Sequence, residues 1–419
     1  MPPESSTDHV TPNAWLSIVG IGEDGISGLG AQAKDAIASA TVVFGGKRHI
    51  ELAAPLISGE ARPWSTPFDT AMHEVMTLRG TQVCVLASGD PFFFGVGVTL
   101  MRHAAPQECR TYPAPSSFSL AASRLGWPLQ DIETVSLHGR PIDLVRPLLH
   151  PGRRVLALTS DAQGPAALAQ LLASSGFGPS RMTVLEALGG ADEHLRSCTA
   201  SDFAFDRVND LNIVALEIRS DGLPRILPLA HGLDDSLFEH DGQITKREIR
   251  AVTLSALAPR RGELLWDVGA GSGSIGIEWM LAHPSMRAIA IEANADRAAR
   301  IRRNSAAFGV PGLEIVEGSA PVALHGLAPP DAIFLGGGGS DPGVLEATIE
   351  HLKAGGRLVA NAVTLEMEGI LLAAHARHGG NLIRIQVSRA AAVGAMQGWK
   401  PAMPVTQWTW IKTGTEQEQ

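Results

Sequence analysis

The chain has 419 residues and a formal net charge of −9, with 45% hydrophobic and 18% charged residues. A chain of this length exceeds one ordinary hydrophobic core, so we expect about two to three domains. The acidic balance argues against a dedicated nucleic-acid binder, for which a basic face is typical. The three cysteines, Cys84, Cys109 and Cys198, lack the spacing of metal ligands. We therefore expect neither a bound metal nor a disulfide framework.

The N-terminal segment and the apolar runs of the chain bear on its localisation. Residues 1–13 are polar and contain no apolar core of the kind that a secretion signal requires. No apolar run approaches the roughly 18 residues that a membrane-spanning helix needs. These features predict a cytoplasmic protein with no membrane partner.

Strand-like runs alternate with helical patterns in the first half of the chain, which is typical of α/β architecture with mainly parallel sheets. The strands are expected at residues 16–19, 41–44, 83–87, 155–159, 182–186 and 211–217. Over residues 221–240, glycines, prolines and acidic residues interrupt the periodic pattern of apolar residues. The sequence therefore predicts a first domain over residues 14–220 and a linker over residues 221–240.

Glycine-rich turns follow two of these strands. Glycine allows backbone amides to approach a nucleotide-like ligand closely, and a following helix N-terminus favours an anionic group. A third turn ends in two serines, one of which is expected to cap a helix. The predicted cofactor-binding residues of this half are Gly20, Gly22, Gly89, Asp90, Pro91, Ser116 and Ser117.

These three turns resemble the recurrent loops of the tetrapyrrole methylase family, over roughly Trp15–Arg219. The resemblance implies a bilobed α/β fold that binds S-adenosylmethionine in the cleft between its lobes, largely through backbone groups. In keeping with it, the run Gly45-Gly46-Lys47 after the second strand contains no acid that could bind a ribose. Lys47 and Arg48 are predicted to contact a carboxylate-rich substrate.

A second α/β domain is predicted over residues 241–413. Its first helix is expected to begin near Gln243, with Thr245 as N-cap and Glu248 at capping-box spacing. Strands are expected at residues 264–267, 288–292, 313–317, 332–335, 356–360, 382–387 and 407–412. The order of strands, loops and helices indicates a Rossmann-like unit.

The loop Asp267–Gly273 and Glu292, at the end of the next strand, indicate a nucleoside site. An acid at that place accepts hydrogen bonds from ribose hydroxyls. The glycine spacing leaves a dinucleotide and S-adenosylmethionine both open, but the Asp267 carboxylate would attract a sulfonium and repel a pyrophosphate. The predicted cofactor-binding residues are Asp267, Gly269, Gly271, Gly273, Glu292, Gly318, Ser319 and Ala320.

This half resembles class I S-adenosylmethionine-dependent methyltransferases over roughly Gln243–Lys412, and more closely the decarboxylating precorrin methyltransferases of cobalamin biosynthesis. The closer resemblance rests on the runs at 241–250, 267–276, 290–292, 318–321 and 334–339. A precorrin carries many carboxylates. Lys246, Arg247 and Arg250 are therefore predicted to form a basic rim that binds it, the alternative being a solvated helix face.

Few side chains offer acid–base chemistry at the predicted site. Gly336–Gly339 leave room for a bulky flat substrate where ligands bind in open α/β folds, and Asn361 and Thr364 end the next strand at the same edge. Asp341 and Asp267 are the predicted catalytic groups. Positioning carries most of the catalysis if the substrate carbon and the methyl group are already reactive.

The two resemblances together imply an enzyme of cobalamin biosynthesis that methylates a precorrin at carbons 5 and 15 and decarboxylates its ring C acetate. They assign carbon 5 to the N-terminal domain, and carbon 15 with the decarboxylation to the C-terminal domain. The first resemblance also implies a homodimer or a higher assembly. A nicotinamide-dependent oxidoreductase and a nucleic-acid methyltransferase are the alternatives. A noncatalytic assembly protein would not need two cofactor sites.

Overall fold

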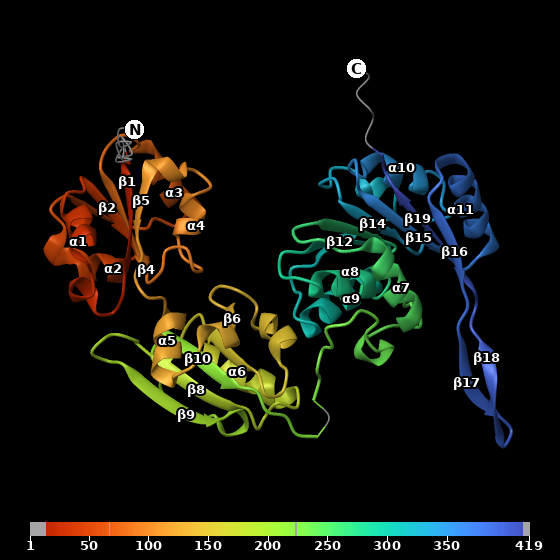
Figure 1. Ribbon diagram of the computed structural model, residues 1–419, viewed down its shortest axis with the longest axis horizontal. Helices are drawn as coiled ribbons and strands as arrows, with labels where there is room; N and C mark the ends of the chain where they lie inside the picture. The colour runs from red at the N-terminus through yellow and green to blue at the C-terminus, as the bar shows by residue number, and fades with distance from the viewer. Residues whose placement is uncertain (1–13, 67, 223, 414–419) are drawn as a thin grey trace, which may run out of the picture. The chain divides into compact units, whose positions relative to one another are not determined.

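The computed structural model describes residues 14–66, 68–222 and 224–413, and its chain forms two compact units (Figure 1). The first unit runs to Ile142 and resumes over His150–Arg225. The second unit comprises Asp143–Leu149 and the chain from Ile226 onward. Both units are mixed α/β structures, as the sequence predicts.

The first unit begins with a five-stranded sheet in which all neighbouring strands are parallel. Helices α1 and α2 pack on one face and α3 and α4 on the other, so the central strands are near-continuous apolar runs. The strands, in sheet order, are β3 (Glu60–Pro63), β2 (Val42–Gly45), β4 (Val83–Ser88), β1 (Leu16–Ile21) and β5 (Cys109–Tyr112). The helices are α1 (Ala31–Ala38), α2 (Lys47–Ala53), α3 (Phe68–Thr77) and α4 (Gly97–Leu100).

The second sheet of this unit is mostly antiparallel, so the prediction of mainly parallel sheets is wrong here. Only β6 and β7 pair in parallel. Antiparallel neighbours need only a short connection, as between β8 and β9. The strands, in sheet order, are β6 (Glu133–Ser136), β7 (Arg154–Leu158), β10 (Asn212–Glu217), β8 (Arg181–Glu186) and β9 (His194–Thr199), with helices α5 (Ser117–Leu125) and α6 (Gly164–Ser174).

The second unit is built on a seven-stranded sheet in the order β13-β12-β11-β14-β15-β19-β16. The first five of these are parallel, and β19 runs antiparallel between β15 and β16. Strands β12 and β13 lie on one side of β11, and β14 and β15 lie on its other side. The strand order therefore reverses at β11, and open α/β sheets bind ligands at such a switch point. The bounds are β11 (Leu264–Val268), β12 (Arg287–Glu292), β13 (Glu314–Glu317), β14 (Ala332–Leu335), β15 (Arg357–Ala362), β16 (Asn381–Ile385) and β19 (Val405–Ile411).

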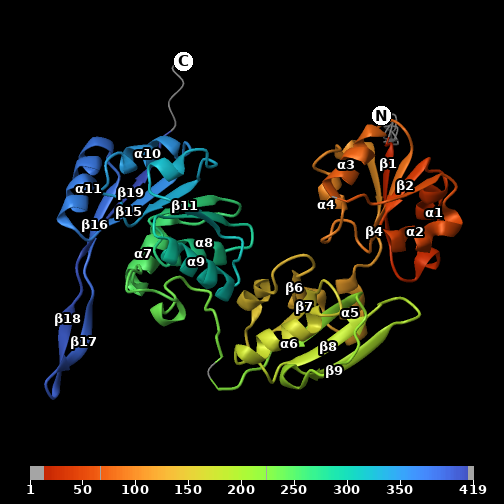
Figure 2. The ribbon, with the colours of Figure 1, turned by 180° about the vertical axis from the view of Figure 1, so that it is seen from behind.

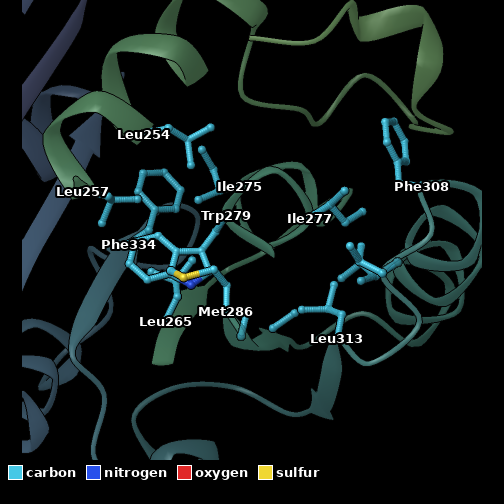
Figure 3. Packing of buried hydrophobic residues seen from close by; sticks show 14 of the residues in the cluster. Leu254, Leu257, Leu265, Ile275, Ile277, Trp279, Met286, Phe308, Leu313 and Phe334 are labelled. Carbon is cyan, nitrogen blue, oxygen red and sulfur yellow. The ribbon is translucent and has the colours of Figure 1, made fainter. Parts of the chain in front are cut away.

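Helices cover both faces of this sheet. Figure 3 shows one core, in which Leu254 and Leu257 of α7 lie near Ile275 and Trp279 of α8. The helices are α7 (Arg247–Leu257), α8 (Ser274–Leu281), α9 (Ala295–Ala307), α10 (Val344–His351) and α11 (Leu365–His378). No helix in the described part of the chain is both long and apolar enough to cross a membrane.

The segment predicted as a linker contributes to the same core. Leu227, Leu233 and Phe238 are buried there. The carboxylate of Glu278 on α8 accepts hydrogen bonds from the backbone amides of Gly232 and Leu233, at 2.7 and 3.0 Å. This part of the chain is therefore integral to the second unit despite its irregular sequence.

A long hairpin of β17 (Ser388–Val393) and β18 (Met396–Pro401) projects from the second unit (Figure 1 and Figure 2). These strands pair only with each other. The sequence prediction missed them, together with β3, β5, β6 and β9, which are the edges of the first unit's sheets. Edge strands carry polar residues and lack the buried apolar run that identifies a central strand.

Truncation of Trp279 to alanine should destabilise the second unit by about 3–5 kcal/mol, because it removes a fully buried ring and leaves a cavity. The indole also donates a hydrogen bond to the carbonyl of Arg287 at 3.0 Å. Trp399→Ala is the matched control, since that ring is 78% exposed. Thermal unfolding of the full-length variants measures the change in stability that each substitution causes. Equal destabilisation by the two substitutions would contradict the buried packing of Trp279.

Candidate active site

A cavity of about 720 Å³ lies at the carboxyl ends of the parallel strands of the second unit. Its lining residues follow each of these strands in turn, at the edge where the switch point predicts a ligand. One half of the lining comes from the loops after β11, β12 and β13. The other half comes from the loops after β14 and β15, the start of α7 and the base of the hairpin. These lining segments include Val268–Gly271, Ile291–Ala293, Gly318–Ala320, Gly336–Gly338, Thr245, Lys246 and Val387.

The loops after β11 and β14 touch through their backbones. Gly269 has φ +72°, and a Cβ built on it would lie 2.0 Å from the carbonyl oxygen of Gly337. Only glycine fits such a contact. Gly271 also lines the cavity, as predicted. Gly273 does not: a Cβ there would meet Ile301 at 2.8 Å. The structure thus corrects the prediction for Gly273, which is a packing position at the start of α8.

Glu292 lies at the end of β12 with its carboxylate fixed beside the glycine loop. Its Oε2 accepts the amide of Gly271 at 2.8 Å, and its Oε1 accepts the amide of Asn294 at 3.0 Å. Each carboxylate oxygen can accept a further hydrogen bond. Because Glu292 lines the cavity, its carboxylate is placed to accept hydrogen bonds from the two hydroxyls of a ribose.

Asp267 lies beneath the loop instead of in the cavity. It is 1% exposed, and its Oδ2 accepts the amide of Gly276 at 2.9 Å. Its Oδ1 has no hydrogen-bond partner among the described residues. Burial, with a smaller contribution from the charge of Glu292, raises the pKa of Asp267 to about 7. The predicted contact with a cationic ligand, and the predicted catalytic role, are therefore wrong for this residue.

Asn361 and Asp341 line the other half of the cavity. The amide of Asn361 is held by two buried side chains. Its Nδ2 donates to the hydroxyl of Thr253 at 2.9 Å, and its Oδ1 accepts from Nε2 of Gln407 at 2.9 Å. Thr364, by contrast, caps α11 through the amide of Met367. The arrangement fixes the Asn361 amide at the edge of the cavity, next to the glycines of the loop after β14.

The predicted basic rim is only partly present. Lys246 lines the cavity, at 3.8 Å from Asp235. Arg247 is exposed and does not line the cavity, and its guanidinium is 3.9 Å from Asp234.

The prediction for Arg250 is wrong, because its side chain is fully buried. Its Nε donates to the Glu278 carboxylate at 2.5 Å, and its Nη1 donates to the carbonyl of Thr245 at 2.5 Å. Arg250 therefore supports the wall of the cavity from behind. Helix α7 begins at Arg247 with Lys246 at the N-cap, so the predicted capping box at Thr245 and Glu248 is also wrong.

Two cations in the lining were not among the predicted site residues. Arg297 of α9 is 3.0 Å from Asp241, and Arg389 of β17 is paired with Glu248 of α7. Arg297 belongs to a run of arginines that is typical of a solvated helix face. Arg389 lies in a hairpin without a recognisable motif. Neither signal could distinguish a cavity residue from a surface residue.

In the first unit, the three predicted loops meet through backbone atoms. A Cβ on Gly20 would lie 1.9 Å from the carbonyl oxygen of Gly89, and one on Gly89, which has φ +58°, would lie 2.9 Å from that of Pro115. The amide of Ala114 donates to the carbonyl of Gly89 at 3.4 Å. The structure therefore brings together the loops that contain Gly20, Gly89 and Ser116, which the sequence predicts to bind a cofactor.

Side chains in these loops mainly stabilise the loops themselves. Asp90 accepts the amide of Phe92 at 2.8 Å, and Ser116 caps α5 by accepting the amide of Ser119 at 3.1 Å. Ser117 is the first residue of α5. A ligand bound at these loops would therefore form its hydrogen bonds mainly with backbone groups.

Lys47 and Arg48 begin helix α2 near the first glycine loop. The guanidinium of Arg48 contacts the Glu23 carboxylate and lies 2.9 Å from Nε2 of His49. Burial, followed by the charge of Arg48, lowers the pKa of His49 to about 4. The imidazole is therefore neutral at neutral pH, and Arg48 is engaged by the loop that follows Gly22.

Comparison with known proteins identifies related sequences for both units. A family model described as tetrapyrrole (corrin/porphyrin) methylases matches residues 16–204, and one described as a precorrin methyltransferase domain matches residues 236–412. A Sinorhizobium protein named precorrin-6Y C(5,15)-methyltransferase (decarboxylating) is 65% identical, covering 97% of this chain and 99% of its own. A Mycobacterium tuberculosis (strain ATCC 25618 / H37Rv) protein of the same name is 42% identical, covering 95% and 100%.

A shorter relative matches part of the chain. The Salmonella typhimurium protein named cobalt-precorrin-6B C(15)-methyltransferase (decarboxylating) is 36% identical over 180 residues. The match covers 41% of this chain and 92% of the relative.

The raised pKa of Asp267 predicts a specific dependence of stability on pH. Between the ordinary aspartate pKa of about 3.9 and the raised value of about 7, the folded state holds a proton that the unfolded chain has released. Raising the pH across this window therefore lowers the free energy of unfolding. Asp267→Asn should remove that loss and stabilise the protein at pH 8 by a few kcal/mol, on the order of 1.4 kcal/mol per pKa unit.

Denaturant titration of the wild type and the Asp267→Asn variant at pH 5 and pH 8 measures this difference. Asp296→Asn, in the first turn of α9 and exposed, is the control and should leave the pH dependence as it is in the wild type. A wild-type pH dependence retained in Asp267→Asn would show that the pKa of Asp267 is not raised in the folded state.

Proposed function

The chain belongs to the family of decarboxylating precorrin-6Y C(5,15)-methyltransferases, and we propose that each of its two units carries out one of the two methyl transfers. The enzyme methylates its precorrin substrate at carbons 5 and 15 and decarboxylates it, in cobalamin biosynthesis. This membership excludes the oxidoreductase and the noncatalytic alternatives. We propose the ring C acetate as the group that loses carbon dioxide.

The methyl donor that we propose is S-adenosylmethionine, which when bound supplies an electrophilic methyl group. In the second unit, Glu292, Gly269 and Gly271 would hold it, together with Gly318–Ala320. The Glu292 carboxylate carries the proposal, because it faces the cavity with both oxygens fixed by backbone amides. The contact of Gly269 with Gly337 provides a surface free of side chains beside it.

The contribution of the remaining cavity residues is to position the substrate and exclude water. Gly336–Gly338 leave space for a flat macrocycle, and the fixed amide of Asn361 offers a hydrogen bond to its rim. Such alignment of two reactive groups supplies much of the rate enhancement in a reaction of this kind. We propose Asp341 as the group that handles a proton, since it lines the cavity and Asp267 does not.

The comparisons support the division of labour that we propose between the units. The precorrin methyltransferase model matches only the second unit. A separate relative whose name specifies carbon 15 and decarboxylation has about the length of one unit, since a match of 180 residues covers 92% of it. The second unit is the one whose sequence resembles decarboxylating precorrin methyltransferases. We therefore assign these two reactions to the second unit and carbon 5 to the first, where the loops of Gly20, Gly89 and Ala114 would hold a second S-adenosylmethionine.

The precorrin is the partner that this function requires. We propose that nucleic acid is not a partner, because the net charge of −9 opposes binding to a phosphate backbone. Assembly into a homo-oligomer and a cytoplasmic location remain predictions from the sequence.

Glu292→Ala should lower kcat/KM for carbon dioxide release and methylation at carbon 15 by about 100-fold, because it removes the charged acceptor for the ribose hydroxyls. Glu317→Ala is the matched control, since that carboxylate ends the neighbouring strand, pairs with Arg302 and does not line the cavity. The assay uses full-length protein, precorrin-6Y and S-adenosylmethionine with a ¹³C-labelled methyl group.

The position of the label, read by NMR, and the released carbon dioxide report the two activities of the second unit. Melting temperatures of both variants identify any loss of fold. Unimpaired carbon dioxide release by a folded Glu292→Ala variant would contradict the proposed cofactor site.

A further inference from the structure

An ion pair joins the hairpin to helix α7 at the rim of the second unit's cavity. Arg389 of β17 contributes the guanidinium and Glu248 of α7 contributes the carboxylate. Both residues line the cavity. Their side chains are 48% and 45% exposed, so the pair lies where the cavity opens to solvent.

Arg389 differs from the other two cations of the cavity lining in how it is held. Arg297 binds Asp241, whose carboxylate also accepts the amide of Gln243 at 3.0 Å and lies 3.1 Å from Arg300. Asp241 is thus part of a fixed turn. Lys246 lies near Asp235, which the buried Arg250 already binds at 3.1 Å.

Within the described part of the chain, Arg389 and Glu248 make one ion pair, with each other. Among the described residues, no other strand pairs with the hairpin that carries Arg389. Breaking this pair would therefore disturb no further network. An exposed ion pair of this kind contributes little to stability, because solvent screens it and two long side chains must be ordered.

We propose that Arg389 binds a carboxylate of the precorrin, and that Glu248 holds its guanidinium at the cavity rim until the substrate displaces it. The proposal rests on the proposed function, which supplies a polycarboxylate substrate. In the structure, one hydrogen bond joins Nη2 of Arg389 to Oε2 of Glu248. A substrate carboxylate can replace it and accept two parallel hydrogen bonds from the same guanidinium. Replacement of Glu248 by the substrate carboxylate therefore costs little free energy.

Glu248 has a second consequence for substrate selection. An unpaired carboxylate at the rim would repel a polyanion, whereas the pair with Arg389 leaves this part of the rim neutral. Arg389 therefore favours a ligand that has a carboxylate next to its guanidinium, because such a ligand can form an ion pair with it. The base of the hairpin, through Val387, Ala402 and Met403, lines the cavity next to it, so the rest of the macrocycle can contact the same element.

The two partners of the pair should respond to substitution in opposite directions. Arg389→Ala should raise the KM for precorrin-6Y about tenfold with kcat changed less than about twofold, because it removes a charge-assisted contact made in the ground state and the transition state alike. Glu248→Gln should lower KM about two- to threefold, because it removes the competing carboxylate. Arg389→Lys should give an intermediate KM, since lysine lacks the planar fork.

The matched control is Arg384→Ala. Arg384 lies on β16, the strand that precedes the hairpin in the chain, is paired with Glu368 at 2.9 Å and does not line the cavity. Its loss should leave KM and kcat unchanged. The double variant of Arg389→Ala with Glu248→Gln should have a KM above that of the wild type, because the contact with Arg389 is lost. Its KM should be below that of Arg389→Ala alone, because no unpaired carboxylate remains at the rim to repel the substrate.

Steady-state turnover of precorrin-6Y by the full-length variants tests this assignment at saturating S-adenosylmethionine. A purely structural ion pair would raise KM or lower the melting temperature in both single variants alike, and that outcome would overturn the proposal. Wild-type turnover combined with an unchanged KM in Arg389→Ala would also overturn it, while leaving the proposed function intact. Absence of turnover by the wild type would refute the proposed function itself.

Discussion

The backbone contact between Gly269 and Gly337 is the constraint on which the second unit's cavity depends. A side chain at Gly269 would lie within 2.0 Å of the opposing carbonyl oxygen, so the two loops can meet only as backbone. The strands that carry these loops, β11 and β14, are neighbours at the switch point of the sheet. Glu292 then fixes the same loop from β12 through the amide of Gly271. The cavity therefore has a rigid floor at the place where we propose the cofactor.

In the first unit, too, loops meet through the backbones of glycines, but on a sheet of different topology. Gly20 and Gly89 bring the loops after β1 and β4 into contact, where a Cβ on Gly20 would lie 1.9 Å from the Gly89 carbonyl oxygen. The turn before α5 joins the same contact, because the amide of Ala114 donates to the Gly89 carbonyl oxygen. The place at the end of the strand that Glu292 has in the second unit is taken here by Gly45, the last residue of β2, and Gly46 follows it. The two units thus support two proposed cofactor sites by unrelated topologies.

The sequence predicts the central strands and the two glycine sites, because both depend on local residue types. A strand such as β11 is a continuous buried run, and glycine is required wherever backbones touch. Edge strands such as β9 lack that run and were missed. The burial of Arg250 depends on Glu278, a partner from another helix, and the placement of Arg389 depends on how the hairpin leaves the sheet. The spacing of residues along the sequence therefore predicts neither of these tertiary contacts.

The most direct test of two cofactor sites on one chain is calorimetric titration of S-adenosylhomocysteine into three full-length proteins: the wild type, Gly20→Ala and Gly269→Ala. Each substitution adds a methyl group where loops touch, and melting temperatures verify that the variants are folded. If both units bind the cofactor, the wild type should have about two sites per chain and each variant should have one. One site in the wild type, or two in either variant, would contradict the proposal of two cofactor sites.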